Sequence, residues 1–511
     1  MRKEYMATTV FLRNASPVSI PAAYRDGLIL DAFAQLGSST IVANFGMLIE
    51  QVGQPSQAGI DFLWFSAAIY VADKKTLRRH SSDRWTRTFE VSAPVAHPDC
   101  WGTATPMFAE ALSFLTGDRW TFHWRPEQNL IWNARSVGQA SCDTVCLFSG
   151  GLDSLIGAID LLEDETQASV LLLGHYDSPL TSIVQRHLAN ALAEQYGHER
   201  VQLVQIGVRP AETRLMQYAP LPAGRESTTR SRSIIFLSLG LAAASARSAG
   251  TPLYVPENGF IALNVPLVNA RLGSCSTRTT HPHFLTQLQT ALAAIELANP
   301  IVNPFECLTK GETLIHCRNQ LLLRQLACQT VSCAHPDVGR YERVRYGNCG
   351  YCFPCLIRRA SLHTIDLDDP LHYTHDVCTE GNLVGGRGAR GGMPVLFLLR
   401  SRSPLIQAGL LLCSLAPSLK GLIFAILPVC IDRVSTNCAH SSRQSQMLMC
   451  ATLLDCEEHN GKVHLHRYPL SHRSVREATR CHPITRFIGD SGSCDDHIPI
   501  CLHPSASALC G

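Results

Sequence analysis

Cys146-Leu-Phe-Ser-Gly-Gly-Leu-Asp-Ser-Leu-Ile156 decides the fold class of this 511-residue chain. The stretch begins as an apolar strand, turns through Ser149–Ser154 and continues as an apolar run with helical character. Adjacent glycines let backbone N–H groups turn inward, and a helix N-terminus is partly positive, so the turn favours a phosphate. Asp153 lies beside that anion, and we expect Mg²⁺ to bridge the two, because hard oxygen ligands suit this ion. The alternative on these residues alone is an ordinary strand-to-helix turn with a capping Ser or Asp.

Length and composition limit the class of protein. A chain of 511 residues is long enough for two or three domains with a sizeable core. The formal net charge of +2 gives no global field that would point to nucleic acid. The N-terminus shows no secretory signal, so we expect a cytoplasmic protein whose 21 cysteines are reduced and, where clustered, bind metal. No apolar stretch of the C-terminal zone is a clean span of about 20 residues, so no membrane helix is expected there.

Four zones are expected along the chain. Residues 1–140 hold all six tryptophans, with alternating strands at 85–91 and 119–124 around a helix at 101–115, which predicts an N-terminal α+β accessory domain. Residues 141–330 alternate apolar strands with helices, which predicts a doubly wound parallel α/β sheet whose ligand lies at the carboxyl ends of the strands. Residues 331–385 are interpreted as a cysteine module with a closing helix. Residues 386–511, rich in Cys, Ser and His, are interpreted as a frameshifted or disordered tail, or else as a divergent appended domain.

A second motif is formed by Cys333, Cys349, Cys352 and Cys355. Three of these cysteines recur every third residue, and the fourth precedes them across a loop. This spacing is typical of a tetrahedral four-cysteine zinc site. A closed shell of four sulfurs leaves no open position, so the expected Zn²⁺ is structural rather than catalytic.

With both motifs located, the chain resembles a known family. Ser149–Ser154 matches the SGGxDS loop of the PP-loop ATP pyrophosphatases. The four cysteines followed by Arg358 are similar to those of QueC, the 7-cyano-7-deazaguanine synthases. Arg232–Ser238 looks like the GRNxxFLS segment of that family, with Ser233 where Asn is usual, and Thr309–Glu312 resembles its Lys-x-Glu element. The resemblance covers about residues 142 to 370 and implies an adenine nucleotide alpha hydrolase-like PP-loop domain.

The departures from the family pattern concern the setting and the acceptor. QueC enzymes are usually short and lack a preceding domain of this size. The loop after the fourth strand reads Pro256-Glu-Asn-Gly-Phe260 here, instead of the usual acidic, proline-containing substrate loop. Long chains of this layout look like the QueC-like proteins of bacterial anti-phage systems of the Qat type. The expected partners are therefore a small deazapurine substrate and proteins of a defence complex, with no membrane and no stable nucleic-acid partner.

The resemblance implies an ATP-dependent carbon–nitrogen ligase. Such an enzyme adenylates the carboxylate of a 7-deazaguanine, releases pyrophosphate and transfers the acyl group to a nitrogen nucleophile, either ammonia or a protein amine. His281 or His283 would act as the base toward the amine, and the zinc module would bring Arg358 or Arg359 near the pocket. The residues implied for ATP and Mg²⁺ are Ser149, Gly150, Gly151, Leu152, Asp153, Ser154, His175 and Tyr176. Those implied for catalysis are Asp153, Lys310 and Arg232, and those for the acceptor site are Glu257, Asn258, Thr280, His281 and His283.

Three other functions are compatible with the same motifs. One is a plain queuosine-pathway 7-cyano-7-deazaguanine synthase. Another is a tRNA-modifying relative, which would need a basic surface with interleaved aromatics that the sequence lacks. A third, of a different class, is a non-catalytic subunit that binds nucleotide only to license assembly.

Overall fold

The computed structural model describes twelve stretches of the chain in two units, residues 1–451 and 452–511. The described residues are 7–14, 18–32, 39–131, 142–166, 169–176, 178–212, 221–226, 230–263, 278–339, 347–376, 455–459 and 462–466. In the second unit, β11 (Asp455–His459) pairs antiparallel with β12 (Lys462–His466). The remainder of the expected tail, with its frameshift interpretation, lies outside the described residues.

The first unit contains a six-stranded sheet in the order β10-β9-β6-β7-β8-β3. Its strands are β3 (Ile41–Ala43), β6 (Thr144–Leu147), β7 (Val170–Tyr176), β8 (Val201–Pro210), β9 (Leu253–Tyr254) and β10 (Ile301–Val302). Five of them pair in parallel, and only β3 runs antiparallel, along β8. This arrangement confirms the predicted α/β class. Since β7 and β8 lie on one side of β6 and β9 and β10 on the other, the strand order reverses between β6 and β9.

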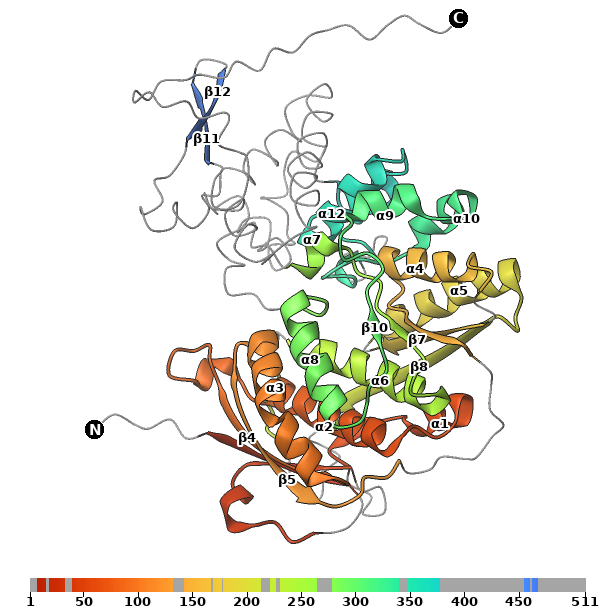
Figure 1. The fold of residues 1–511 in the computed structure, drawn as a ribbon. Coiled ribbons are helices and arrows are strands. Elements are labelled where there is room, and N and C mark those ends of the chain that lie inside the picture. The colour runs from red at the N-terminus through yellow and green to blue at the C-terminus, as the bar shows by residue number, and fades with distance from the viewer. Residues whose placement is uncertain are drawn as a thin grey trace, which may run out of the picture. The chain divides into compact units, whose positions relative to one another are not determined.

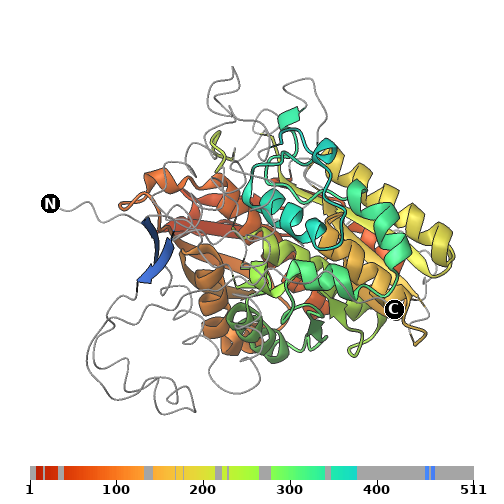
Figure 2. The same ribbon diagram turned by 90° about the horizontal axis from the view of Figure 1, so that it is seen from above.

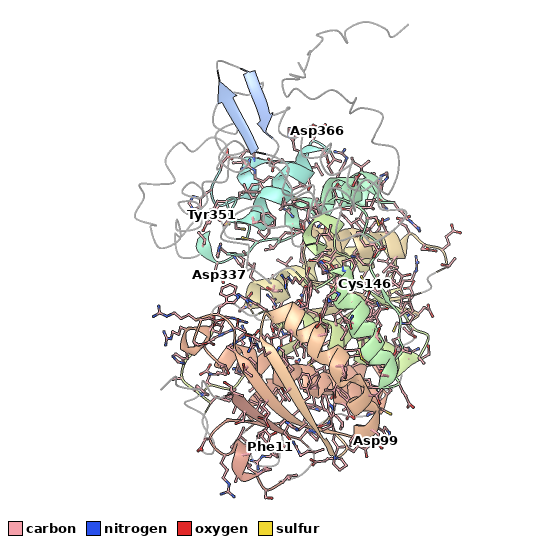
Figure 3. The ribbon with its side chains drawn as sticks, turned by 60° about the vertical axis from the view of Figure 1, so that its left-hand side comes forward. Phe11, Asp99, Cys146, Asp337, Tyr351 and Asp366 are labelled. Carbon is pink, nitrogen blue, oxygen red and sulfur yellow. The ribbon has the colours of Figure 1, made fainter. Side chains whose placement is uncertain are left out.

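Helices cover both faces of this sheet (Figure 1). Val145 and Leu171 pack on one face with α2 (Gln57–Lys75) and α6 (Arg232–Arg247). Cys146 and Leu172 pack on the opposite face with α4 (Leu152–Leu162) and α5 (Pro179–Tyr196). Neighbouring residues of a strand point to opposite faces, so strands covered on both sides are apolar throughout. Cys146 accordingly lies within the packed side chains (Figure 3).

The other helices complete the first unit. They are α1 (Gly46–Val52), α3 (Pro98–Thr116), α7 (Gly259–Ala262), α8 (Pro282–Ala294), α9 (Lys310–His316), α10 (Gln320–Leu326) and α12 (Phe353–His363). Short 3₁₀ turns are η1 (Ala22–Tyr24), η3 (Arg78–His80), η6 (Ala327–Gln329) and η7 (Pro370–His372). Among the helices that the structure describes, none combines the length and the apolarity needed to cross a membrane.

The N-terminal region differs from the expected α+β arrangement. Its four strands, β1 (Thr8–Arg13), β2 (Leu28–Asp31), β4 (Thr88–Val95) and β5 (Arg119–Pro126), form a sheet in the order β2-β1-β4-β5. All the pairs are parallel, and α3 is the helical crossover that returns the chain from β4 to β5 in the same direction. The predicted helix at 101–115 and strand at 119–124 are confirmed as parts of α3 and β5. The predicted strand at 85–91 begins later, at Thr88, and leaves Trp85 exposed.

The two sheets share one apolar core, because α2 packs on α6 and α3 packs on α8 (Figure 2). A buried charge network crosses the same boundary. Asp73 of α2 and Asp118 both pair with Arg87, at 2.5 and 2.7 Å, and Arg78 pairs with Asp118 at 2.9 Å. The second oxygen of Asp73 accepts the backbone N–H of Ser231, which precedes α6, at 2.9 Å. Asp73 therefore fixes the start of α6 to the N-terminal region.

We predict that Asp73→Ala lowers the free energy of unfolding by about 3–5 kcal/mol, because it removes one of the two carboxylates that pair with the buried Arg87 and also the acceptor of the Ser231 N–H. Asp164→Ala is the matched control, since Asp164 forms a half-exposed pair with Arg318 and its loss should change little. Urea denaturation of both full-length variants measures the difference. Equal unfolding midpoints for the two variants would contradict the role given to Asp73.

Candidate functional site

The turn after β6 has the conformation that its two glycines allow. Gly150 adopts a φ of 81°, in the left-handed region that side-chain-bearing residues avoid. A Cβ added there would also lie 3.1 Å from Val184 Cγ1. Gly151 then caps the N-terminus of α4. The chain therefore passes from strand to helix within four residues and leaves the helix N-terminus at the edge of the sheet.

Hydrogen bonds of serine hydroxyls hold this turn in its conformation. Ser149 Oγ accepts the N–H of Gly151 at 3.2 Å and donates to Ser154 Oγ at 3.2 Å. Ser154 in turn donates to the carbonyl of Gly151 at 2.9 Å. The next N–H, of Leu152, donates to Ser332 Oγ at 3.2 Å. The structure thus brings the predicted turn residues together and adds a hydroxyl from far along the chain.

Asp153, on the first turn of α4, lies in a buried polar cluster. Its Oδ2 is 2.5 Å from Lys310 Nζ and accepts from Asn258 Nδ2 at 2.9 Å. Its Oδ1 is buried and has no hydrogen-bond partner among the described residues. A buried carboxylate oxygen without a partner is costly, so this atom is suited to a ligand cation. Mg²⁺ fits the chemistry of this oxygen donor.

The local structure explains why these side chains converge. Lys310 is the first residue of α9, which Thr309 and Glu312 begin with a reciprocal capping box. Glu312 thus caps a helix and leaves Lys310 as the charged residue at the site. Asn258 caps α7, since its Oδ1 accepts the N–H of Ile261 at 3.1 Å, and this bond directs its amide nitrogen toward Asp153.

Glu257 is the second carboxylate of the cluster. It is held by the hydroxyl of Thr280, which donates to Oε2 at 2.5 Å. Burial, with a smaller effect of the charge of Asp153, raises the pKa of Glu257 to about 7, against the lowering effects of Thr280 and Lys310. Glu257 therefore exchanges a proton near neutral pH.

A pocket opens between Glu257 and the serines of the turn. It is lined by Leu147, Phe148, Ser149, Ser154, Leu173, His175, Phe236, Leu239, Val255, Pro256, Glu257 and Thr279. The residues come from the carboxyl ends of β6, β7 and β9 and from α6, so the pocket lies where the strand order reverses. This is the position at which open α/β sheets bind ligands. Its mostly apolar walls and few polar groups are typical of a small-molecule site.

Of three other predicted residues, His175, Arg232 and Tyr176, only the first lines this pocket. His175, at the end of β7, lines it and packs edge-on against Phe236 with ring centroids 5.1 Å apart. Arg232 begins α6 and lies over the same Phe236 ring at 5.1 Å. Tyr176 packs over Gly207 of β8 and is not among the lining residues.

The two histidines expected at the acceptor site lie elsewhere. His281 caps α8 by accepting the N–H of His283 at 3.2 Å, and His283 contacts Glu110 of α3 at 3.2 Å. Both rings pack against Phe114 of α3. Burial lowers the pKa of His281 to about 4, so it is neutral at physiological pH. Of this segment, Thr280 reaches Glu257 and Thr279 lines the pocket, whereas the histidines join α8 to α3.

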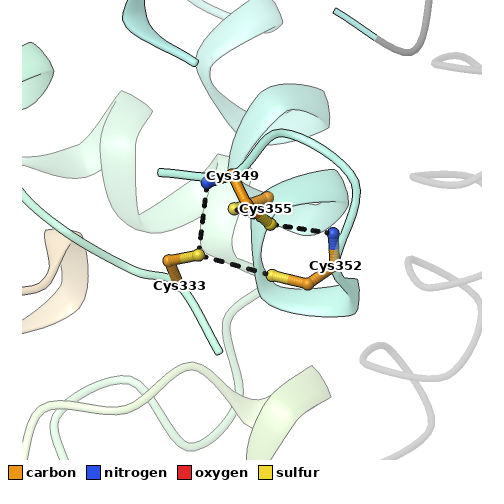
Figure 4. A group of neighbouring side chains, drawn as sticks. All are labelled: Cys333, Cys349, Cys352 and Cys355. Atoms are coloured by element: carbon orange, nitrogen blue, oxygen red, sulfur yellow. Dashed lines mark hydrogen bonds between the residues drawn. The ribbon is translucent and has the colours of Figure 1, made fainter. Parts of the chain in front are cut away.

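The four predicted cysteines form one cluster (Figure 4). Their sulfur atoms all lie within 4.8 Å of one another, and the pairs Cys333–Cys352 and Cys349–Cys355 are each 3.8 Å apart. Zn–S bonds of about 2.3 Å in a tetrahedron place sulfurs about 3.8 Å apart. The cluster can therefore hold a metal such as zinc.

Backbone donors surround these sulfurs. Cys333 Sγ accepts the N–H of Cys349 at 3.2 Å, and Cys349 Sγ accepts that of Cys352 at 3.4 Å. Hydrogen bonds among the four thiols lower the pKa of Cys352 and raise the pKa values of Cys333 and Cys355, and the N–H of Ala334 adds to the lowering at Cys352. Donors of this kind favour the thiolates that a metal needs.

The arginines after the cysteines do not line the pocket, contrary to expectation. Arg358 is fully buried and donates to the Thr330 hydroxyl and to the carbonyl of Ala327. Arg359 pairs with Asp368 and Asp376 at 3.1 and 2.6 Å. Both guanidinium groups serve the packing of the cysteine module.

Sequence reasoning missed Ser332 and Thr279. Neither residue belongs to a spaced motif. Ser332 could have been noticed only as the neighbour of the first cysteine, and Thr279 only as the neighbour of the predicted Thr280. Comparisons with protein-family models, curated proteins and solved structures give no match for this chain. The function is therefore argued from the geometry of the site.

We predict that the purified chain binds one Zn²⁺ or Co²⁺ and that Cys352→Ser abolishes most of this affinity, because three thiolates cannot close the tetrahedron. Cobalt absorption and elemental analysis measure the binding. Cys100→Ser, in α3, is the control and should bind like the wild type. Undiminished binding by Cys352→Ser would exclude this cluster as the metal site.

We predict that Glu257→Gln changes how stability depends on pH. Between the ordinary 4.5 and the raised value of about 7 for the pKa of Glu257, the folded chain holds a proton that the unfolded chain has released. Stability should therefore fall as pH rises through this window in the wild type, relative to Glu257→Gln, and the difference should level off above it. Urea midpoints across the range measure it. The exposed Glu306→Gln should follow the wild type, and parallel curves for all three proteins would refute the prediction.

Proposed function

We propose that this chain is an ATP-dependent ligase of the QueC type, which adenylates a carboxylate and passes the acyl group to a nitrogen nucleophile. The observation that carries the proposal is the cluster of Asp153, Lys310 and Glu257 beside the Ser-Gly-Gly turn. The turn supplies N–H and hydroxyl donors for phosphates. Among the described residues, the cluster supplies both an unpartnered carboxylate oxygen and an ammonium group, and its third member, Glu257, lines the pocket.

Each group has a defined part in this chemistry. Ser149, Ser154 and the turn N–H groups would bind the β- and γ-phosphates. Mg²⁺, when bound at Asp153 Oδ1, would neutralise charge on the leaving pyrophosphate. Lys310 would stabilise the charge that develops at the α-phosphate, because a buried ammonium acts strongly at short range. In the first step a carboxylate oxygen bonds to the α-phosphorus and the bridging oxygen departs with pyrophosphate.

The second step consumes the acyl-adenylate. The nitrogen of ammonia or of a protein amine bonds to the acyl carbon, AMP leaves with the former carboxylate oxygen, and the nitrogen loses a proton. Glu257, whose pKa is raised to about 7 by burial, can take up that proton near neutral pH. The base thus proposed is Glu257 rather than His281 or His283.

The proposed substrate is the carboxylic acid of a 7-deazaguanine. Phe148, Phe236 and Leu239 give the pocket apolar walls that suit a flat heterocycle, and Glu257 and Thr279 offer polar contacts at its rim. The choice among planar acids follows the family resemblance. Membership of an anti-phage complex with protein partners also stays a prediction from that resemblance.

We expect the full-length chain, given ATP, Mg²⁺, 7-carboxy-7-deazaguanine and an ammonium salt, to release pyrophosphate in proportion to product. Asp153→Asn and Lys310→Met should each reduce the rate by about 10²-fold or more, since each removes charge stabilisation from the transition state. Pyrophosphate assays coupled to mass spectrometry of the product measure this.

Asp160→Asn is the matched control, because Asp160 also lies on α4 but accepts the N–H of Arg318 at 2.8 Å, away from the pocket. Its rate should stay close to that of the wild type. Nucleotide binding without any acid-dependent pyrophosphate release would refute the ligase and favour the non-catalytic assembly subunit. Full activity in Asp153→Asn would refute the role of the cluster.

A further inference from the structure

Residues 330–333 connect the anion-binding turn directly to the cysteine cluster. This short segment, here called the connecting segment, ends at the first metal ligand, Cys333. Its two middle residues contact the turn around Gly150 and Gly151. About 180 residues of sequence separate the two sites, yet one extended stretch touches both.

The contacts on the turn side involve the groups that shape it. The N–H of Val331 donates to the carbonyl of Gly150 at 3.0 Å. Ser332 Oγ accepts the N–H of Leu152, the first residue of α4, at 3.2 Å. A Cβ added to Gly151 would lie 3.2 Å from the same Ser332 Oγ. The connecting segment therefore fixes both the carbonyl of the left-handed residue and the first N–H of the helix.

Residues of the cysteine module contact the connecting segment as well. Asn348, which precedes Cys349, accepts the N–H of Ser332 and donates to the carbonyl of Thr330, both at 3.0 Å. Cys355 Sγ lies 3.9 Å from the carbonyl oxygen of Ser332. The backbone of Ser332 is thus clamped by residues that neighbour or are metal ligands.

The position of the Ser332 hydroxyl therefore depends on the closed cysteine cluster. Metal binding contributes free energy to the fold of the residues that bring the ligands together. Among the described residues, contacts of its sulfur with Cys349 and Cys352 join Cys333 itself to the module, and an ion would add a bond from each of the four sulfurs to one centre. A hydroxyl that accepts from an N–H also keeps its own O–H as a donor, so a well-placed Ser332 can both order the turn and face an anion.

We propose that Ser332 is a positioning residue of the nucleotide site and that, through it, metal binding at the cysteines and nucleotide binding at the turn strengthen each other. The inference rests on the proposed function only in requiring that the turn binds a nucleotide. Because such coupling is a free energy shared by two sites, it is reciprocal. The cysteine module then stabilises the ATP site as well as the residues around the cysteines themselves.

The test measures binding of α,β-methylene-ATP with Mg²⁺ to the full-length chain by calorimetry. Removing the metal with a chelator should weaken binding at least about fivefold, within the usual range of coupling between sites. Ser332→Ala, with the metal still bound, should also weaken binding about fivefold, the effect of losing one hydrogen bond. Ser332→Thr keeps the hydroxyl and should restore most of the affinity.

Ser361→Ala is the matched control, since Ser361 is in the same module but donates to the carbonyl of Ile357 within α12. It should bind the analogue like the wild type. In the reverse direction, α,β-methylene-ATP should raise the affinity for Co²⁺, read from its absorption in competition with a chelator, by the same factor, and Ser332→Ala should reduce that factor.

The outcomes separate this inference from the proposed function. Equal analogue binding by Ser332→Ala and Ser361→Ala, or equal Co²⁺ affinity with and without the analogue, would overturn the coupling and leave the ligase standing. Failure of the metal-loaded wild type to bind the analogue at all would overturn the nucleotide site itself. Because Ser332→Ala retains the metal, its result holds even if the metal-free chain loses structure.

Discussion

The buried pair of Asp153 and Lys310 is the interaction on which the site depends. A carboxylate and an ammonium group removed from water lose hydration that their attraction only partly returns, so such pairs are poor sources of stability. Here the pair joins the first turn of α4 to the first turn of α9, with Asn258 as a third contact and one carboxylate oxygen left without a partner among the described residues. An arrangement that costs stability and is incomplete fits a binding site better than a structural clamp.

Charge balance around this pair explains the behaviour of Glu257. Two carboxylates and one ammonium group lie close enough to affect one another's charge, so ionising both acids leaves an excess negative charge in a medium of low polarity. Glu257 therefore keeps its proton until the pH reaches its raised pKa of about 7. Asp153 has the ammonium group of Lys310 beside it. The two acids therefore have different tasks, one as a partner of cations and the other as a group that exchanges protons.

The sequence predicted the elements that are marked by a regular pattern of residue types or that require one particular residue type. The parallel sheet followed from apolar strands, the turn from Gly150 and Gly151, and the cluster of four cysteines from their spacing. The sequence was less informative where packing between distant segments determines strand pairing or the position of a side chain. No local sequence pattern indicates that β1, β2, β4 and β5 pair in parallel. Nor does one indicate that His281 packs against Phe114 instead of lining the pocket, or that Arg358 donates to the Thr330 hydroxyl. These outcomes depend on which distant helix covers each residue.

For the same reason, the contacts that hold the site in place could not be predicted from the sequence. Residues of α4 and α6 line the pocket, and the N-terminus of neither helix is fixed by the sheet alone. Asp73, from the N-terminal region, accepts the N–H groups of Arg230 and Ser231 just before α6, and Ser332, beside the first cysteine, accepts that of Leu152. A helix terminus held by a carboxylate from outside has its positive end already satisfied, whereas one held by a hydroxyl can still receive an anion. Of the two, α4 is therefore the helix whose N-terminus is better suited to an anion, while Phe236 of α6 lines the pocket.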